Sequence, residues 1–207
     1  MSANNRIQAM IDKHEIIEVS TNPHWCRDSG DWAGLVLCFH PDAHVQSSWF
    51  SGSPSEFGQQ SKEMMAGHHP KDVQRHVMGN PRVALKGQRA VCEYSVILYQ
   101  HRVIDGYEFD LTTWSVSLDL FEKRDGQWRI SRRITIYEKD RMDPHNAAEV
   151  PESYFARMDL SGFPTAIRYH CYRNARSGYP PSANLVLKGT SQEEVVREEA
   201  VAWLAGG

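Results

Sequence analysis

Cysteine is scarce in this chain, and its placement argues against two common kinds of cysteine site. The sequence has four cysteines, Cys26, Cys38, Cys92 and Cys171, and no two of them form a Cys-x-x-Cys motif. A zinc knuckle or a redox-active pair needs such close spacing. We therefore expect reduced, mostly buried thiols that pack as small apolar side chains.

Long apolar runs and charge of one sign are also lacking. No apolar stretch approaches the ~18 residues of a membrane span, and the start, MSANNRIQAMIDKHE, has no signal-peptide core. The formal net charge is −3, and the sequence contains no basic stripe of the kind that binds nucleic acid. The sequence therefore predicts neither a membrane nor a nucleic-acid partner, with the cytoplasm as the default location.

The glycines and histidines form none of the common cofactor or metal motifs. The chain has no Gly-x-Gly-x-x-Gly, no phosphate loop and no Gly-x-Ser-x-Gly elbow. His68 and His69 are adjacent, and adjacent side chains on a helix end point about 100° apart. No Cys or carboxylate follows them at ligand spacing. We expect no cofactor and no metal site.

What is present is an ordinary globular composition in an informative order of elements. The 207 residues include 41% hydrophobic and 24% charged residues, which suits one domain with an extension. Helical spacing and strand-like alternation of apolar residues predict the elements. Helices are expected at 5–22, 24–28, 31–39 and 54–68, one strand at 44–50, and four more strands at 76–85, 90–103, 107–123 and 128–139.

Individual residues mark the ends of these elements. Pro23 is expected to kink or restart the first helix, and Asp31 is a plausible N-cap for the next. Asp105-Gly106 and Asp125-Gly126 are typical of tight hairpin turns. Helices followed by a meander of long strands indicate an α+β fold, a curved antiparallel sheet covered by the N-terminal helices. Such a sheet encloses a cone-shaped cavity, which is a natural pocket.

The last part of the chain, residues 146–207, differs from residues 1–145, which we expect to form the α+β domain. Prolines interrupt it repeatedly, and six tyrosines and phenylalanines make it too aromatic for a disordered tail. A helix is expected at 191–204, with Ser191 as its cap and Gly206 after its end. We interpret this extension as an arm that packs over the body or over a neighbouring subunit.

Two stretches of the chain resemble a known family. Trp25-Cys26-Arg27-Asp28-Ser29-Gly30-Asp31-Trp32, followed by Phe39-His40-Pro41-Asp42-Ala43, resembles the opening signature of the SnoaL-like branch of the nuclear transport factor 2-like superfamily. The ending is also similar: Asp125-Gly126-Gln127-Trp128-Arg129-Ile130, then Arg133, Tyr137 and Arg141-Met142-Asp143-Pro144. The resemblance covers roughly residues 5 to 145 and implies a cone-shaped α+β barrel, in agreement with the order of elements.

The resemblance also implies catalytic roles. Scytalone dehydratase-like and hexachlorocyclohexane dehydrochlorinase-like members of this branch use an Asp-His dyad. The aspartate is the first Asp of an Asp-x-x-Asp-Trp segment, here Asp28, and the histidine opens the strand after the third helix, here His76. The resemblance implies that Asp28 orients His76 and that His76 abstracts a proton. An arginine that assists the leaving group is implied at Arg133, with Arg132 as the alternative because strand parity is uncertain by one.

Each of these residues also has a structural interpretation. The alternative for His76 is a core histidine that hydrogen-bonds across the sheet, and the alternative for Asp28 is a helix-end cap. Arg133 is equally explained by an ion pair with a neighbouring acid such as Glu138, or by a solvated strand face.

Polar and aromatic residues on the strands are the candidates for a substrate pocket. On a period of two, alternate residues of a strand share one face, and they line the cavity if that face turns inward. Surface placement is the alternative. The candidates are Tyr99 and His101 on one strand, Asp110, Thr112 and Trp114 on the next, and His44 and Trp49 on the early strand.

The function expected from this pattern is that of a cofactor-independent lyase acting on a small aromatic or apolar molecule. A dehydratase, a dehydrohalogenase and a formaldehyde-releasing lyase are the three versions, and the length and aromatic arm resemble formaldehyde-releasing lyases of lignin-derived aromatics. An isomerase with the same base, and a non-catalytic ligand-binding or small-subunit module, are the alternatives. Relatives are commonly dimers or trimers, so we expect a homo-oligomer.

Overall fold

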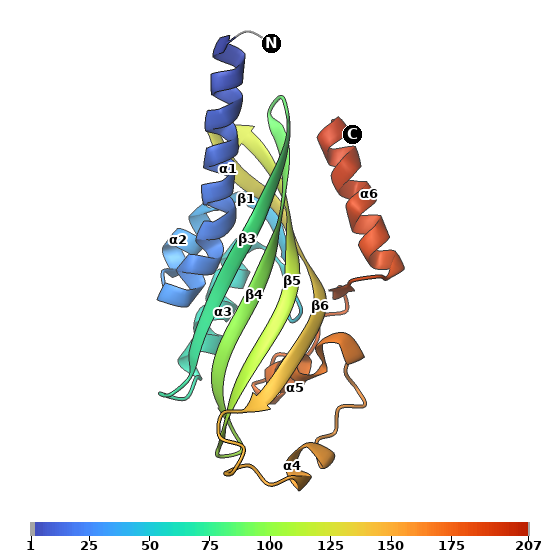
Figure 1. Cartoon of the computed structure of the whole chain (residues 1–207). Helices are drawn as coiled ribbons and strands as arrows, with labels where there is room; N and C mark the ends of the chain where they lie inside the picture. The colour runs from blue at the N-terminus through green and yellow to red at the C-terminus, as the bar shows by residue number, and fades with distance from the viewer. Residues whose placement is uncertain (1–2, 207) are drawn as a thin grey trace.

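The computed structural model in Figure 1 describes residues 3–206 and shows a long, curved sheet with helices on both of its faces. The chain begins with α1 (Ala3–Ser29), α2 (Trp32–Leu37), β1 (Phe39–Gln46), β2 (Ser51–Gly52) and α3 (Pro54–Ala66). Four long strands follow: β3 (Val73–Lys86), β4 (Arg89–Ile104), β5 (Tyr107–Arg124) and β6 (Gln127–Pro144). The chain continues through α4 (Ser153–Ala156), a 3-10 turn (Thr165–Ile167), α5 (Arg168–Arg176), β7 (Val186–Leu187) and α6 (Ser191–Ala205).

The sheet is mainly antiparallel, and its strands follow the order β2-β1-β6-β5-β4-β3. The strands β3 to β6 form a meander, whereas β1 and β7 each pair with β6 in parallel. Asp105 and Asp125 adopt positive φ angles of 54° and 51° beside glycines in the two predicted hairpin turns. The predicted α+β class, with a curved antiparallel sheet and N-terminal helices, is confirmed.

The first helix differs from the expectation at Pro23. The helix α1 runs without interruption from Ala3 to Ser29, so the predicted restart at His24 is wrong. Proline removes one helical hydrogen bond, but Ile16, Ser20 and His24 bury this face against the sheet. Tertiary packing therefore outweighs the local cost.

The N-cap predicted at Asp31 agrees with the structure, and the helix after it has a cap that was not predicted. The Asp31 carboxylate accepts a hydrogen bond from the Gly34 backbone N–H at 2.9 Å, which begins α2. Ser53 and Glu56 form a capping box at the start of α3. These caps fix where the helical layer turns, and hence where α1 ends beside the sheet.

Strand β1 begins and ends earlier in the sequence than the strand expected at 44–50. It spans Phe39 to Gln46, so Trp49 lies in the turn after it rather than within it. The pairing of β1 with β6 shifts register between Phe39 and His44, and this irregularity tolerates Pro41 inside the strand.

The C-terminal extension packs on its own chain. The helix α6 covers the outer face of the sheet, where Val196 and Ala200 contact the apolar face made by Leu118, Leu120 and Ile134. The 3-10 turn and α5 pack on the inner side through Ile167 and Cys171, respectively, against Tyr137 of β6. The cap of α6 is Thr190 rather than Ser191, because the Thr190 hydroxyl accepts the Glu193 N–H. Gly206 ends the helix at φ 97°, as expected.

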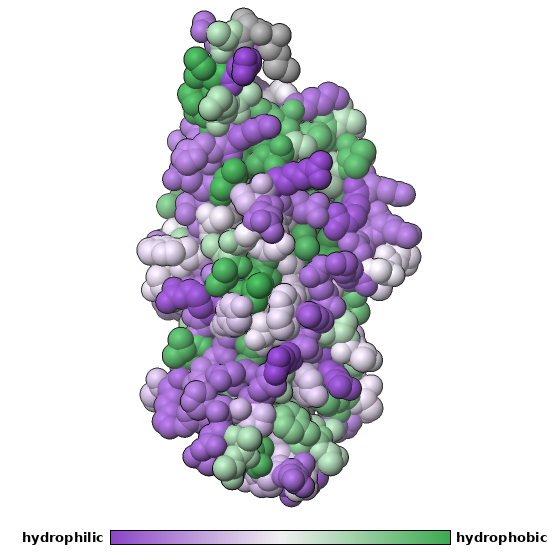
Figure 2. Space-filling view, in the orientation of Figure 1, coloured by the Kyte–Doolittle hydropathy of each residue, from purple (hydrophilic) through white to green (hydrophobic). Residues whose placement is uncertain are grey.

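The outer surface mixes polar and apolar residues. Figure 2 shows apolar residues in small groups between polar ones on the face seen in Figure 1. Within residues 3–206, no helix is both long and apolar enough to cross a membrane.

Candidate active site

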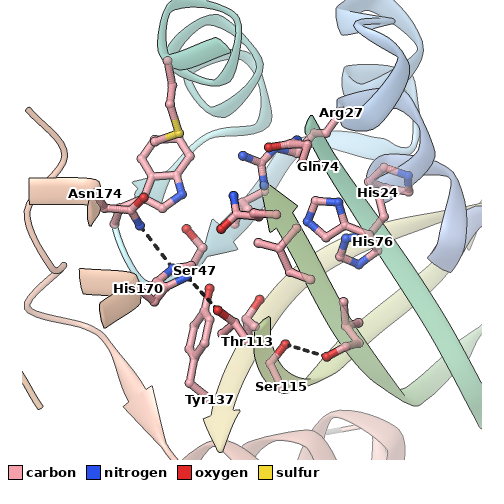
Figure 3. A pocket seen from close by; sticks show the side chains of 18 of the residues that line it. His24, Arg27, Ser47, Gln74, His76, Thr113, Ser115, Tyr137, His170 and Asn174 are labelled. Carbon is pink, nitrogen blue, oxygen red and sulfur yellow. Dashed lines mark hydrogen bonds between the residues drawn. The ribbon is translucent and has the colours of Figure 1, made fainter. Parts of the chain in front are cut away.

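A cavity lies between the sheet and the helices, with walls from α1, α3, β3 to β6 and α5. The empty space between its walls is about 760 Å³, a volume that includes open solvent at the mouth. Only about 60 Å³ of this space is wide enough for the centre of a water molecule. The pocket is therefore narrow, and a small molecule would contact its walls closely. Figure 3 shows His24 and His76 on one side, and His170 and Asn174 on the other.

Asp28 and His76 meet at the first side of the cavity. The Asp28 Oδ1 atom lies 2.7 Å from Nδ1 of His76, and Oδ2 accepts the His76 backbone N–H at 2.7 Å. The side chains are 2% and 6% exposed, respectively. None of residues 3–206 hydrogen-bonds Nε2 of His76, so this nitrogen is left for a molecule in the cavity.

Strand pairing explains why these two residues meet. The strand β3 is the last strand of the sheet, so the backbone groups on its outer edge have no strand partner. Asp28 lies in the last turn of α1. Its carboxylate binds both the edge N–H of His76 and the imidazole of His76. The carboxylate therefore docks the helix on the sheet and sets the ring orientation at once.

A buried ionic cluster lies behind His76. Its neighbour His24 has its ring centroid 4.9 Å away and pairs through Nε2 with the Tyr94 hydroxyl at 3.1 Å. Arg133 donates to both oxygens of Asp119, at 2.7 and 2.6 Å, and to the Tyr94 hydroxyl at 2.8 Å. Burial acts to lower the pKa of Arg133, but the charge and hydrogen bonds of Asp119 raise it above its usual range.

Arg133 rather than Arg132 faces the interior, as expected, but the acid that pairs with Arg133 is not the expected one. Arg133 faces the interior and borders the cavity, whereas Arg132 faces α6 and pairs with Glu199. The acid opposite Arg133 is Asp119 rather than Glu138, which pairs with Lys188. Most of the Arg133 donors are occupied within the protein, so its part in assisting a leaving group stays a prediction.

The opposite side of the cavity carries a second histidine, His170, on α5. Its Nε2 atom lies 2.7 Å from Ser48 Oγ and 3.1 Å from Asn174 Nδ2, and its Nδ1 atom lies 3.2 Å from Thr113 Oγ1. All three partners are neutral. His170 is therefore held by hydroxyl and amide groups, without the carboxylate that accompanies His76.

Burial lowers the pKa of all three cavity histidines. For His76 the hydrogen bond and the charge of Asp28 act in the opposite direction and raise the pKa, which nonetheless stays below the usual value. For His170 and His24 the pKa lies well below the usual value, because nearby arginines add to the effect of burial. All three rings are neutral near pH 7, and a neutral imidazole can accept a proton.

Of the residues expected to line the pocket, Trp49 does so, and the candidates on the central hairpin do not. Tyr99, His101, Asp110 and Thr112 lie together on the opposite face of the sheet. Trp114 lies on the same outer face, where it contacts Lys139, and His44 pairs with Ser51 outside the cavity. The inward-facing residues are instead Leu98 and Gln100 of β4 and Thr113 and Ser115 of β5.

A bulge in β3 decides which residue of β4 lies opposite His76. Counted from the turn that pairs Lys86 with Arg89, an unbroken ladder would place His76 opposite Tyr99. The register shifts between Gly79 and Arg82, so His76 pairs with Leu98. Asn80 has a φ of 54° and the next residue, Pro81, has no N–H to donate. Both features favour a bulge and were available as a sequence signal.

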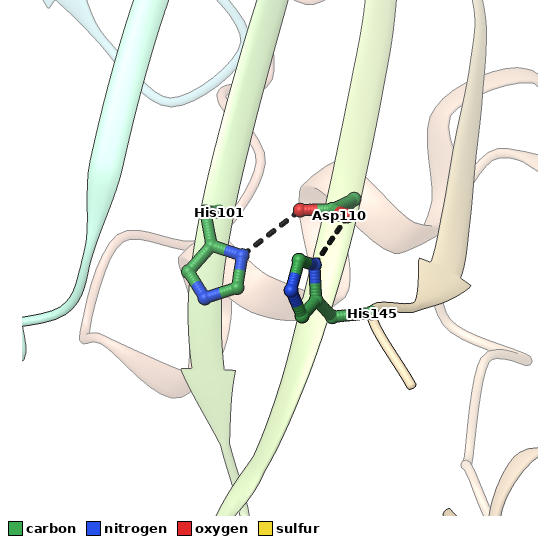
Figure 4. A group of neighbouring side chains, drawn as sticks. All are labelled: His101, Asp110 and His145. Carbon is green, nitrogen blue, oxygen red and sulfur yellow. Dashed lines mark hydrogen bonds and ion pairs between the residues drawn. The ribbon is translucent and has the colours of Figure 1, made fainter. Parts of the chain in front are cut away.

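The outer face also holds a cluster of possible metal ligands that we did not expect. Figure 4 shows that the carboxylate of Asp110 lies between His101 and His145, and each imidazole Nδ1 is 2.9 Å from one Asp110 oxygen. One ligand atom from each residue lies within 4.8 Å of the others. These mutual hydrogen bonds account for the arrangement, and His101 also pairs with Glu108 at 3.0 Å.

Sequence reasoning missed the residues that α1 and α5 place in the cavity wall. Arg27 precedes Asp28 in the family signature, and Arg173 lies in the extension. His170 and Asn174 stand four residues apart, which indicates one face of a helix. That spacing could have identified a polar helix face, although not the surface on which it would dock.

Comparison with known proteins identifies the family. A family model described as a SnoaL-like domain matches residues 8–134. A PEP2-like protein of Fusarium vanettenii is 32% identical over 148 residues, which cover 70% of this chain and 62% of that protein. The match thus spans 62% of the length of the curated relatives.

Solved structures are similar in fold. A hexachlorocyclohexane dehydrochlorinase superposes with a TM-score of 0.60 at 13% identity, covering 71% of this chain and 99% of that chain. A possible scytalone dehydratase from Novosphingobium aromaticivorans gives a TM-score of 0.55 at 15% identity, covering 70% and 97%. At such identities the likeness concerns the fold alone.

Proposed function

Because the chain belongs to the SnoaL-like domain family, we propose that it is a cofactor-independent lyase in which His76 is the base and Asp28 orients it. One observation carries the proposal: the Asp28 carboxylate holds Nδ1 of a buried histidine at 2.7 Å and leaves Nε2 facing a narrow cavity. The hydrogen bond to Asp28 requires a proton on Nδ1, so the free Nε2 carries the lone pair.

The proposed reaction begins with proton transfer to Nε2 of His76. Asp28 stabilises the imidazolium that forms, because a nearby carboxylate favours the charged state. A positioned base of this kind contributes ~10²–10⁴-fold to the rate, and orientation in a closed pocket supplies further acceleration. The surroundings favour a neutral His76 at the start, as a base requires.

The bond that breaks next depends on the substrate. In a dehydratase or dehydrohalogenase the proton comes from carbon, a carbon–carbon double bond forms, and water or halide leaves. In a formaldehyde-releasing lyase acting on a diaryl 1,3-diol, the proton comes from one hydroxyl group, whose carbon leaves as formaldehyde when the carbon–carbon bond breaks. The electron pair of that bond forms a carbon–carbon double bond, and the second hydroxyl group leaves as water. The aromatic wall around Trp49, which stacks on Phe57 with 5.7 Å between ring centroids, supports a small aromatic substrate.

The test is turnover of a panel of aromatic alcohols, diaryl diols and aryl-alkyl halides. We expect one class to be consumed, with release of water, formaldehyde or halide measured directly. His76→Ala should reduce the rate by ~10²–10⁴-fold, while His14→Ala, on an exposed position of α1, should leave it unchanged. Equal turnover by the parent protein and His76→Ala would refute the mechanism.

A second candidate keeps the same base but returns the proton to another carbon, which makes the protein an isomerase. The second polar wall, with His170 opposite His76, supports this version because it places another proton-carrying group across the cavity. Deuterium from solvent appearing in an unbroken product would favour isomerisation, and a fragmented or dehydrated product would favour the lyase.

A further inference from the structure

Two arginines face the cavity without a carboxylate partner. Arg27 lies on α1 immediately before Asp28, and Arg173 lies on α5, where it is 8% exposed. Within residues 3–206 neither guanidinium forms a salt bridge, and the Nε atoms of both are buried without a hydrogen-bond partner. Arginine is seldom buried in this way unless a counter-ion accompanies it.

Three neutral polar atoms that line the same cavity also lack hydrogen-bond partners. They are Ser47 Oγ, Gln100 Oε1 and Asn174 Oδ1, on three separate parts of the chain. Nearly all buried polar groups in folded proteins are hydrogen-bonded, so a cluster of exceptions around one cavity indicates a bound molecule. Water can satisfy the neutral atoms, but it leaves the two positive charges uncompensated.

The nearest acids are already occupied. Asp28 is bound to the ring and backbone of His76. Asp72 lies 3.9 Å from Arg102 and accepts the backbone N–H groups of His69 and Val103. Among the described residues, no Asp or Glu lines the cavity. The cavity therefore carries an excess of positive charge.

The positive charges act on one another and on the same histidine. Burial, followed by repulsion from Arg102 and Arg27, lowers the pKa of Arg173 to about 9. Burial also lowers the pKa of Arg27. Both arginines lower the pKa of His170 in addition to the effect of burial. An anion in the cavity would relieve this repulsion.

Aromatic rings lie beside the positive charge. The guanidinium carbon of Arg27 is 5.8 Å from the ring centroid of Trp49 and 5.2 Å from that of Phe57. A ligand that reaches the arginines therefore also contacts an aromatic wall. Planar guanidinium groups match carboxylates through paired hydrogen bonds, and the narrow cavity favours a compact, singly charged anion over a phosphate.

We propose that the cavity binds an aromatic monocarboxylate, with the carboxylate held by Arg27 and Arg173 and the ring against Trp49 and Phe57. The inference rests on the proposed function for the identity of this cavity as the substrate site, and it adds the charge that the substrate carries. It requires no covalent step of its own.

The test compares the affinity of the full chain for benzoate and for benzamide, its neutral isostere, by calorimetry and tryptophan fluorescence. We expect benzoate to bind more tightly. Arg27→Gln and Arg173→Gln should each weaken benzoate binding by ~10- to 100-fold and leave benzamide binding unchanged. Arg176→Gln is the matched control, because Arg176 is on the same helix, exposed, and paired with Asp105. Circular dichroism checks that each variant folds.

Equal affinity for benzoate and benzamide would overturn the proposal, as would unchanged benzoate binding in both arginine variants. Tighter binding of phenyl phosphate than of benzoate would overturn the carboxylate assignment. His76→Ala separates this inference from the lyase proposal, because it should retain benzoate binding. Arginine-dependent benzoate binding without turnover of any compound in the panel would support the anion site and refute the lyase.

Discussion

The two sides of the cavity solve the burial of charge in opposite ways. On the side of β3 and α1, His76 and Arg133 each have a buried carboxylate within 2.7 Å, from Asp28 and Asp119. On the side of α5, the ring of His170 has only neutral partners, although its backbone N–H donates to Asp140, and Arg173 has no counter-ion within the described chain. The charges of His76 and Arg133 are thus compensated within the protein. Arg173 on the second side, like Arg27 on α1, is compensated by a bound molecule under our proposal.

This difference separates two tasks that one pocket must perform. A base needs a fixed partner that steadies its charged state, which a built-in carboxylate provides. A binding group needs unsatisfied capacity, because a donor already paired within the protein gains little from a ligand. Under our proposals, the built-in carboxylate of the first side serves the chemistry, and the unpaired arginines Arg27 and Arg173 serve recognition.

The largest expected effect is on turnover, when the group that binds Nδ1 of His76 is removed and compared with removal of the group that binds Nδ1 of His170. Asp28→Asn removes the negative charge behind His76, and we expect the turnover of any accepted panel substrate to fall by ~10²–10⁴-fold. Thr113→Val removes the corresponding hydroxyl beside His170 and should cost less than about tenfold, as one neutral hydrogen bond does. Steady-state rates of the two variants over pH 5–9 make the comparison. Equal losses would show that the two sides do not differ in role.

The next effect is on stability and has opposite signs on the two sides. Arg133→Gln leaves Asp119 buried without its partner, and we expect the free energy of unfolding to fall by ~3–5 kcal/mol. Arg173→Gln removes a charge that has no partner, so stability should stay the same or rise. Urea denaturation of both variants without ligand measures the difference. A large loss in Arg173→Gln would mean that its charge is compensated within the fold.

The smallest effect is on the pH dependence of stability. Burial, with the charges of nearby arginines, holds the pKa of folded His170 well below its usual value, so as the pH falls below about 6.5 the unfolded chain binds up to one proton more than the folded chain. His170 thus favours the fold above pH 6.5, and that contribution is lost as the pH falls, by up to ~1.4 kcal/mol per pH unit. His170→Gln should flatten the decline in the unfolding free energy over this range.

His145 provides a control of opposite sign. The hydrogen bond and charge of Asp110 raise the pKa of His145 above its usual value. Its contribution is therefore complete below pH 6.5 and is lost as the pH rises. His145→Gln should change the slope in the direction opposite to His170→Gln, and a change in the same direction would contradict the assigned shifts.

The fold was predictable because its signals are local. The Asp105-Gly106 and Asp125-Gly126 turns fix two hairpins, and alternation between them fixes the strands. The continuous α1 and the early start of β1 were missed because both depend on packing that overrides the preferences of Pro23 and Pro41. Local rules give the elements, and tertiary contacts adjust their ends.

The site was predictable only in part. Asp28 and His76 lie 48 positions apart, and the family resemblance, rather than local pattern, suggested that they meet. Tyr99 and Asp110 were candidates on the condition that their face turns inward, and alternation alone does not decide which face of a strand is buried. A bulge in β3 places Leu98 rather than Tyr99 opposite His76. His170 and Arg173 were missed because the docking of α5 depends on surfaces that exist only in the folded protein.

The strand β7 lies beside β6 where β1 has ended, and the chain just before β7 is bound to the end of β1 and to the turn that follows it. The Asn184 carbonyl accepts from Gln46, and the Ser182 N–H donates to the Ser48 carbonyl at 2.7 Å. During synthesis the meander can pair as soon as it emerges, since its contacts are close in sequence. The wall contributed by α5 forms only after residues 165–187 have followed, so under our proposal Arg173 joins Arg27 at the cavity late in translation. A nascent chain halted before that point would hold His76 and Arg27 but lack Arg173 and one wall of the pocket.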